Sequence, residues 1–249
     1  MEALSDRSRA QVVACLRGYF DELVRRGALT SNPAASVEHY TIKTKIGHYQ
    51  ALKPHEMGAF LDAIKPETLL DLQERAIIAL MGYSCARVGA VTKMKQGDVY
   101  EEDGHLFVSL DEKGDHRHYV PCHPELEGYL REFLARSSKP SDDCDLNPAG
   151  WLFRRWDKKR KVLTGRPLSR LICYHMVKRR NGKVGLANVT NHTFRATGIT
   201  TFLDAGGSLD DARRLANHAS VNTTKLYDHR NEKVSLADVQ KIDYRRRRS

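Results

Sequence analysis

Three side chains in the last third of the chain have types and spacing suited to chemistry on a phosphate group. His192 and Arg195 lie three residues apart, so both side chains share one face if the segment is helical. A guanidinium can bind two phosphate oxygens at once. Tyr227 follows, and a phenol, whose pKa is about 10, is a poor nucleophile unless positive neighbours favour its anion. Taken singly, a helical His/Arg pair is usually a surface feature, and a tyrosine in a basic helix usually packs.

Three further residues lie where a fold could present them to the same phosphate. Arg87 directly follows an apolar stretch, where packing holds a side chain in place, although an arginine at a helix end often only extends into water. Lys113 stands at the tip of an expected hairpin, where lysines are common. His218 follows a short capped helix. Along the chain, the candidate catalytic residues are Arg87, Lys113, His192, Arg195, His218 and Tyr227.

The segments that must position these groups are mainly helical in pattern. Apolar residues recur at helical spacing within 6–26, after Pro54 and from 126 to 134. Residues 76–81 are apolar all round, as expected of a buried helix. Beyond residue 190 we expect three short helices: the first capped at Thr190 or Asn191, the second capped at Ser208, and the third beginning at Asn222 or Thr223. Hairpins are expected around Asp103-Gly104 and Lys113-Gly114, a loop over 138–150, and a helix within part of 154–183. The pattern predicts a mainly α fold with a small antiparallel β-sheet, of the α+β class.

The order of the six groups and the sequence around them resemble the catalytic domain of the tyrosine site-specific recombinases, the phage integrase family. Residues 74–83 are similar to the buried helix before the family's first catalytic arginine. Residues 191–195 resemble its His-x-x-Arg box. Residues 215–227 resemble its Leu-Gly-His-x-Ser…Thr…Tyr segment. The resemblance covers roughly residues 50–240 and implies the recombinase fold.

Three positions depart from the family pattern. Ala90 stands three residues after the first arginine, where the family usually has glutamate. Asn217 replaces the glycine before the second histidine, and Ala196 stands where a histidine is common. The missing glutamate means that a supporting carboxylate is either absent or supplied from elsewhere.

The resemblance implies site-specific DNA recombination, as in integration or excision. Tyr227 would attack a phosphodiester, form a 3′-phosphotyrosyl bond and free a 5′-hydroxyl. Arg87 and Arg195 would neutralise the non-bridging oxygens. His192 would accept a proton or donate to the phosphate, His218 would donate a hydrogen bond, and Lys113 would protonate the leaving oxygen. We expect no metal and no other cofactor.

The charge distribution is consistent with a polyanionic partner. The chain carries 41 basic and 31 acidic residues, and residues 151–249 contain 23 basic against 8 acidic, a net charge of +15. We therefore expect double-stranded DNA as partner. The expected DNA-contacting residues come from the basic stretch 154–183 and are Arg154, Arg155, Lys158, Lys159, Arg160, Lys161, Lys178, Arg179 and Arg180.

The expected organisation has two parts. Residues 1–46 would be a remnant of the family's helical core-binding domain with a linker, and residues 47–249 the catalytic domain with a basic C-terminal tail. Whether the chain is a fragment or a reduced family member stays open. A helix after Tyr227 would either pass to a neighbouring subunit, giving a tetramer on DNA, or pack on its own domain. An accessory DNA-bending protein is a further candidate partner.

The composition bears on membrane insertion and on the cellular compartment. No uncharged stretch exceeds eleven residues, so no membrane span is expected. Five cysteines without a Cys-x-x-Cys pair indicate reduced thiols, and we expect a cytoplasmic protein.

Three competing readings remain at this stage. Asp111-Glu112-Lys113 with Asp98 upstream could hold Mg²⁺ in a metal-dependent nuclease. A catalytically impaired DNA-binding regulator could use the same fold. A metal site at His116, His118, Cys122 and His123 is a third reading, although the spacing suits tetrahedral ligands poorly.

Overall fold

The computed structural model describes residues 5–37, 50–112 and 117–228. The chain divides into two compact units, residues 1–47 and 48–249. The first contains α1 (Asp6–Arg25), which Ser5 caps by accepting a hydrogen bond from the backbone N–H of Ser8. Gly27 follows the helix with a φ of +72°, a conformation that glycine adopts without steric cost. Asn32 then forms a turn by accepting a hydrogen bond from the backbone N–H of Ala34.

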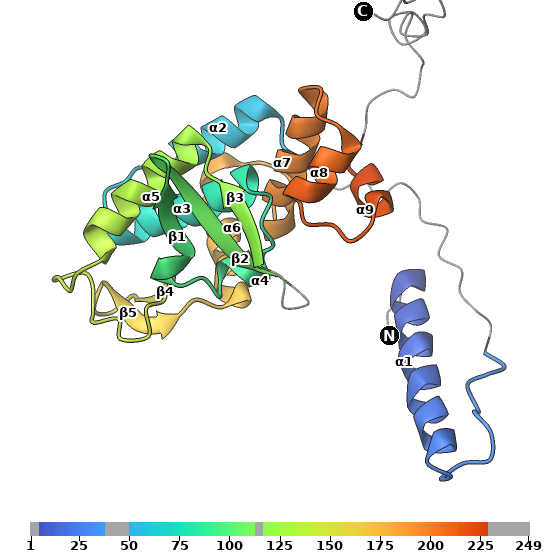
Figure 1. Cartoon of the computed structure of the whole chain (residues 1–249). Coiled ribbons are helices and arrows are strands. Elements are labelled where there is room, and N and C mark those ends of the chain that lie inside the picture. Colours follow the sequence, from blue (N-terminus) through green and yellow to red (C-terminus); the bar gives the residue numbers. More distant parts are fainter. Residues whose placement is uncertain (1–4, 38–49, 113–116, 229–249) are drawn as a thin grey trace, which may run out of the picture. The chain divides into compact units, whose positions relative to one another are not determined.

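The centre of the second unit is a helix that is apolar nearly all round, α3 (Leu69–Tyr83). Its N-terminus is closed by a capping box, in which Thr68 and Asp71 each bind the other's backbone N–H. The helix packs against α5 (Pro124–Ser137) and α7 (Asn191–Asp204), as Figure 1 shows. The shorter α2 (Pro54–Asp62) joins the same core through an edge-on contact between Phe60 and Phe194, with ring centroids 5.1 Å apart.

A three-stranded antiparallel sheet carries the chain from α3 to α5. After α4 (Val88–Val91) and the 3₁₀ turn η1 (Gln96–Asp98), the strands follow in the order β1 (Val99–Glu102), β2 (His105–Asp111) and β3 (Arg117–Pro121). The first hairpin turns at Asp103 and Gly104, both with positive φ, as expected from the Asp-Gly signal. The register pairs Asp111, the last residue of β2, with Arg117, the first residue of β3. The turn between them, with Lys113-Gly114, lies outside the described residues.

The basic stretch after residue 150 contains a hairpin that we did not expect. The strands β4 (Arg154–Asp157) and β5 (Val162–Pro167) pair antiparallel, and α6 (Arg170–Val184) follows. Ser169 caps α6 and Gly185 ends it with a φ of +78°. The sequence predicts the helix but not the hairpin. Each strand is short, and four consecutive cations lie between them, so the alternation of apolar and polar residues typical of strands is too brief to recognise.

Three helices close the described part of the chain, at the end of the unit away from β4 and β5 in Figure 1. Thr190 caps α7, and Ser208 caps α8 (Leu209–Leu215) by accepting from the N–H of Asp211. The last helix, α9 (Val221–Lys225), begins one residue earlier than expected, with Ser220 as its cap. The expected mainly α fold with small antiparallel sheets is confirmed. The expected helix after Tyr227 lies almost wholly outside the described residues.

Candidate active site

The Tyr227 hydroxyl lies against the helix that carries the His-x-x-Arg pair. Tyr227 directly follows Leu226, the C-cap of α9, and its backbone N–H donates to the carbonyl of Thr224. Its Oη is 3.0 Å from Nε2 of His192, which sits in the first turn of α7. The tyrosine is 2% exposed, whereas His192 reaches solvent. A buried phenol is therefore hydrogen-bonded to an imidazole that solvent or a substrate can approach.

His218 packs against the ring of the tyrosine. Its ring stacks on that of Tyr227, with centroids 5.7 Å apart and an angle of 19° between the planes. Its Nδ1 is 3.0 Å from Oγ1 of Thr224, a buried hydroxyl of α9. The residue before it, Asn217, has a φ of +47°, a conformation favoured by glycine and tolerated by asparagine. The departure from the family's glycine therefore keeps the backbone conformation that presents His218.

Arg195 is buried in the middle of this cluster. One turn along α7 from His192, it donates from Nη1 to the carbonyl of Cys85 and from Nη2 to that of Ala216, the latter at 2.6 Å. Its side chain is 2% exposed. The two carbonyls belong to the segments that carry Arg87 and His218, so Arg195 joins three segments of the chain.

Arg87 lies where α3 gives way to α4 and is the N-cap residue of α4. Its side chain is 43% exposed, so its guanidinium remains open to a ligand. It donates from Nη1 to Oε2 of Glu112 and, at 3.4 Å, to the carbonyl of Asn217. The structure thus brings together five of the six expected residues. The sixth, Lys113, lies outside the described residues.

Close packing between α3 and α7 sets the position of both arginines. Gly198 on α7 faces the carbonyl of Gly82 so closely that an added Cβ would be 2.0 Å from that oxygen and 2.9 Å from Sγ of Cys85. No side chain fits there. The glycine therefore permits the helix contact that brings Arg195 beside the Arg87 segment.

Glu112 also belongs to this site, although it was not among the residues expected from the sequence. Glu112 directly follows β2, and its side chain is 2% exposed. Its Oε2 accepts from Arg87, and its Oε1 is 3.8 Å from Nη1 of Arg195. The absence of an acid at Ala90 indicated that another carboxylate could lie near the arginines. The sequence alone does not show which acid this is, because Arg87 and Arg195 are 108 positions apart.

The surroundings keep both histidines neutral at physiological pH. Loss of solvation, followed by the charges of Arg195 and Arg87, lowers the pKa of His192 below its ordinary value of 6.5. The same causes lower the pKa of His218 to about 4. A neutral His192 can accept a proton from Tyr227. Desolvation also lowers the pKa of Arg195, partly offset by interactions with Cys85 and Tyr227.

Two of the nine residues expected to contact DNA are buried, which corrects that expectation. Arg154 is 0% exposed and donates to the carbonyls of Ser137 and Asp145. Arg180 is 4% exposed and pairs with Asp71 and Glu74 on α3. Both arginines hold the fold together. The remaining seven are exposed, namely Arg155, Lys158, Lys159, Arg160, Lys161, Lys178 and Arg179.

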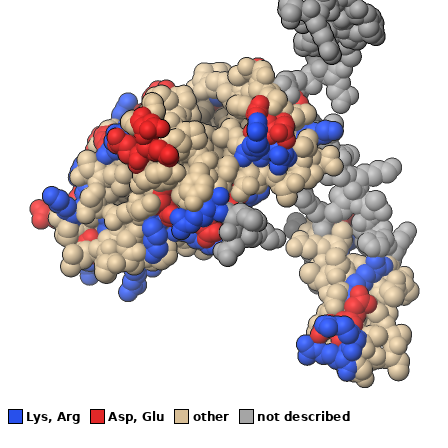
Figure 2. All heavy atoms as spheres, in the orientation of Figure 1, with Lys and Arg blue, Asp and Glu red and all other residues tan. Residues whose placement is uncertain are grey.

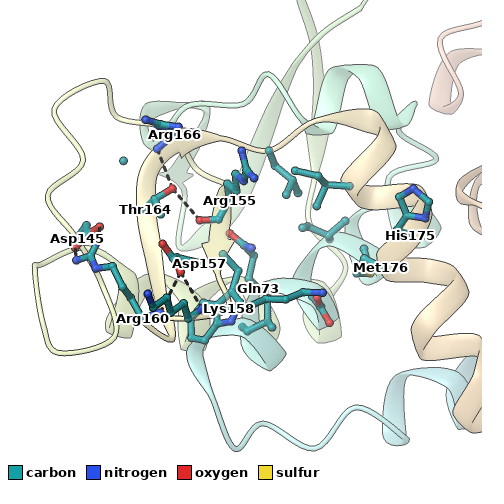
Figure 3. A pocket seen from close by; sticks show the side chains of 18 of the residues that line it. Gln73, Asp145, Arg155, Asp157, Lys158, Arg160, Thr164, Arg166, His175 and Met176 are labelled. Atoms are coloured by element: carbon teal, nitrogen blue, oxygen red, sulfur yellow. Dashed lines mark hydrogen bonds and ion pairs between the residues drawn. The ribbon is translucent and has the colours of Figure 1, made fainter.

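Most of the exposed residues surround a pocket of about 1220 Å³ between the β4–β5 hairpin, α3 and α6. Figure 3 shows Arg155, Lys158 and Arg160 at its edge, with Arg160 bound to the carboxylate of Asp145. None of the five expected catalytic residues that the structure describes lines it. On the face seen in Figure 2, lysines and arginines form separate patches. The basic charge of this part of the chain is therefore distributed over several elements.

The carboxylates of the competing nuclease reading are paired with cations. Asp98 binds Arg117 at 3.0 Å, Asp111 lies 3.7 Å from Lys93, and Glu112 faces the two arginines. For the histidine reading, Nε2 of His118 lies 3.0 Å from the carbonyl of Leu215. Within the described ranges no group of three or more His, Cys, Asp or Glu side chains could hold a metal ion. In the same ranges, no helix is both long and apolar enough to cross a membrane.

Comparison with known proteins finds tyrosine recombinases, in agreement with the residues of the site. The family model described as "Phage integrase family" matches residues 50–233. Tyrosine recombinase XerD of Listeria innocua is 26% identical over 245 residues, which cover 96% of this chain and 77% of the relative. Tyrosine recombinase XerC of Lactobacillus delbrueckii subsp. bulgaricus is 25% identical over 245 residues, covering 98% and 77%.

Solved structures show the same fold. The XerH site-specific recombinase, in a post-cleavage complex with its palindromic difH substrate, aligns with a TM-score of 0.71 at 18% identity. The match covers 90% of this chain and 64% of the XerH chain. The Tn1549 transposon integrase, in complex with a circular intermediate DNA, aligns with a TM-score of 0.69 at 15% identity, over 96% of this chain and 79% of the other.

The fold and the clustered arginines, histidines and tyrosine define a tyrosine recombinase catalytic domain. The chain belongs to the phage integrase family. It is therefore an enzyme of the class that cleaves and rejoins DNA at specific sites, as its resemblance to that family predicted.

Proposed function

We propose that this recombinase exchanges DNA strands with Tyr227 as its nucleophile. The observation that carries the proposal is the 3.0 Å contact between Tyr227 Oη and His192 Nε2, within the cluster that holds Arg195, Arg87 and His218. A phenol with a neutral imidazole beside it can lose its proton as it attacks. Two guanidiniums close to it match the charge that develops on a phosphate.

In the cleavage step Tyr227 Oη forms a bond to phosphorus and the bond from phosphorus to the 5′-oxygen breaks. The phenolic proton passes to Nε2 of His192. Arg87 and Arg195 neutralise the non-bridging oxygens, and His218 adds a hydrogen bond. The leaving 5′-oxygen takes a proton from Lys113, a role that rests on the position of this lysine in the sequence. The product is a 3′-phosphotyrosine and a free 5′-hydroxyl.

Rejoining reverses the same step on a second strand. The 5′-hydroxyl of that strand gives its proton to Lys113 as it attacks phosphorus. The bond from phosphorus to Tyr227 Oη breaks, and Tyr227 recovers its proton from His192. One phosphate ester replaces another, so the reaction needs neither ATP nor an external water molecule. The chemistry also needs no metal ion, since the arginines supply positive charge at the phosphate.

The partner is double-stranded DNA, consistent with the DNA complexes of the XerH and Tn1549 enzymes. The seven exposed cations of the β4–β5 hairpin and α6 contact its phosphates. On DNA the protein forms a tetramer, with an accessory DNA-bending protein as a further partner. Residues 1–46 serve as a helical core-binding segment with a linker, and the enzyme works in the cytoplasm, where DNA is available.

A covalent-trap experiment tests the proposal. Supercoiled plasmids carrying fragments of DNA from the source are incubated in EDTA with the wild-type chain or with Tyr227→Phe, and the reaction is stopped with SDS. We expect a protein–DNA adduct in the wild type alone, with the modified peptide containing Tyr227. Cleavage that requires a metal and leaves no adduct would contradict the proposal in favour of a nuclease. DNA binding without cleavage would favour a regulator.

A further inference from the structure

Glu112 occupies an unusual position for an acidic side chain in an enzyme that binds a polyanion. It lies among the cationic residues of the site, where a free carboxylate would repel phosphate. Its side chain is only 2% exposed, however, and both carboxylate oxygens point to guanidiniums. Oε2 accepts from Nη1 of Arg87, and Oε1 lies 3.8 Å from Nη1 of Arg195. The carboxylate therefore bridges the two arginines from inside the protein and leaves the exposed part of Arg87 to a ligand.

The two arginines differ in how much their positions depend on this carboxylate. Arg195 has two backbone carbonyls, of Cys85 and Ala216, that fix its guanidinium in the absence of any acid. Among the residues that the structure describes, Arg87 has only a 3.4 Å hydrogen bond to the carbonyl of Asn217 besides its bond to Glu112. Its side chain is 43% exposed, so little packing restrains it. Arg87 would therefore be the arginine that loses its position without Glu112.

Electrostatics gives the same assignment. Desolvation, followed by the charge of Arg195, lowers the pKa of Arg87, since two neighbouring guanidiniums repel each other. A buried negative charge between them offsets this repulsion. The position three residues after Arg87, where the resemblance predicts an acid, is occupied by Ala90, which is buried at 4% exposure and carries no charge.

We propose that Glu112 is the positioning residue that holds Arg87 and Arg195 at the spacing of one phosphate, and that it replaces, from the end of β2, the carboxylate missing at Ala90. Glu112 touches no substrate in this role; it acts through the arginines. The inference rests on the proposed function, because positioning has meaning only if the arginines bind the phosphate that Tyr227 attacks.

The test measures single-turnover cleavage of a nicked duplex that carries the cleavage site mapped by the covalent trap. Glu112→Gln keeps the shape of the side chain and removes its charge. We expect this change to slow adduct formation about 10- to 100-fold, the scale of a small misplacement of a reacting group, with unchanged non-covalent affinity for the duplex. The matched control is Asp111→Asn, whose carboxylate pairs with the exposed Lys93, and it should cleave at the wild-type rate.

A double-mutant cycle separates positioning from a merely structural role. If Glu112 acts through Arg87, adding Glu112→Gln to Arg87→Ala should slow cleavage much less than Glu112→Gln slows the wild type. A purely structural role would give multiplicative losses and a matching loss of DNA affinity. Should Glu112→Gln not fold, Glu112→Asp keeps the charge with a shorter reach and should show the same non-additivity with a smaller loss.

The outcomes distinguish this inference from the proposed function. Absence of an adduct with the wild-type chain would overturn the proposed function itself. An adduct that forms equally fast with wild type and Glu112→Gln would overturn only the role of Glu112. Multiplicative losses with Arg87→Ala would overturn the positioning role as well.

Discussion

The Tyr227 hydroxyl lies 3.0 Å from Nε2 of His192, although the two residues are 35 positions apart and belong to segments separated by α8. Helix α7 presents the histidine in its first turn, and α9 returns the chain so that the tyrosine faces it. The ring of His218 stacks on that of Tyr227. The nucleophile is therefore in contact with two imidazoles that are neutral at physiological pH, and one of them, His192, can accept its proton.

The state of His192 predicts how cleavage depends on pH. Because the pKa of His192 is lowered below 6.5, more than half of the imidazole is neutral at pH 6.5 and the neutral form dominates at higher pH. Through His192 protonation, the rate of adduct formation should therefore change less than about two-fold between pH 6.5 and 8. It should fall as the pH drops below 6.5 and protonation removes the acceptor. Single-turnover rates across this range check the expectation.

His192→Gln is the control for the pH profile. The variant should cleave about 10²- to 10⁴-fold more slowly, the usual contribution of a general base, and should lack the wild-type loss in acid. A wild-type profile whose acid loss has its midpoint above pH 6.5 would contradict the role given to His192.

The backbone at Asn217 predicts an unusual order of stability. With a φ of +47°, this residue should accept glycine with little loss, whereas Asn217→Ala should cost about 1–2 kcal/mol of folding free energy. Denaturant unfolding of the two variants measures the difference. If the alanine variant were the more stable, the conformation that places His218 would not be the one described.

The close contact at Gly198 predicts that an added methyl group destabilises the fold there, in contrast to the exposed Gly182. Gly198→Ala places a Cβ 2.0 Å from the carbonyl oxygen of Gly82, so α7 must move away from α3, and the chain should lose several kcal/mol or fail to fold. Gly182→Ala, on the exposed face of α6 with no atom within 4 Å of the added Cβ, should instead stabilise by about 0.5–1 kcal/mol. Equal unfolding midpoints for the two variants would contradict the close contact of α3 with α7.

The exposed cations of the β4–β5 hairpin predict a salt effect. If Lys158 and Lys159 each neutralise one phosphate, replacing both by alanine should reduce the slope of log affinity against log salt by about 1.8, or ~0.9 for each contact. Fluorescence anisotropy with a labelled duplex measures the slope. Lys65→Ala, an exposed lysine after α2, is the control and should leave it unchanged. An unchanged slope in the double variant would remove this hairpin from the DNA interface.

Much of the fold follows from local signals that the structure uses directly. The Asp103-Gly104 turn has the positive φ values that its residues favour, and Ser208 caps α8 through Asp211 as the capping pattern indicates. The second half of helix α3 is recognisable because residues 76–81 are all apolar and leave no polar face there. These features depend on residues within a few positions of each other, so the sequence contains all the information needed for them.

The features that sequence reasoning missed depend on distant partners. Arg154 resembles one cation of a basic surface in the sequence, but its buried guanidinium donates to the carbonyls of Ser137, the last residue of α5, and Asp145. Glu112 looked like part of an Asp-x-Lys metal motif, but it faces two arginines. Arg180 is likewise held by α3 acids more than 100 positions earlier. No local pattern distinguishes a buried, paired charge from a solvated one.

The most direct test of the central claim is the identity of the residue linked to DNA. Mass spectrometry of the adduct trapped in EDTA should find the nucleotide on the peptide that contains Tyr227. Tyr227→Phe, which keeps the ring that packs on His218, should bind the same DNA and give no adduct. An adduct on another residue, or one that persists in Tyr227→Phe, would contradict the account.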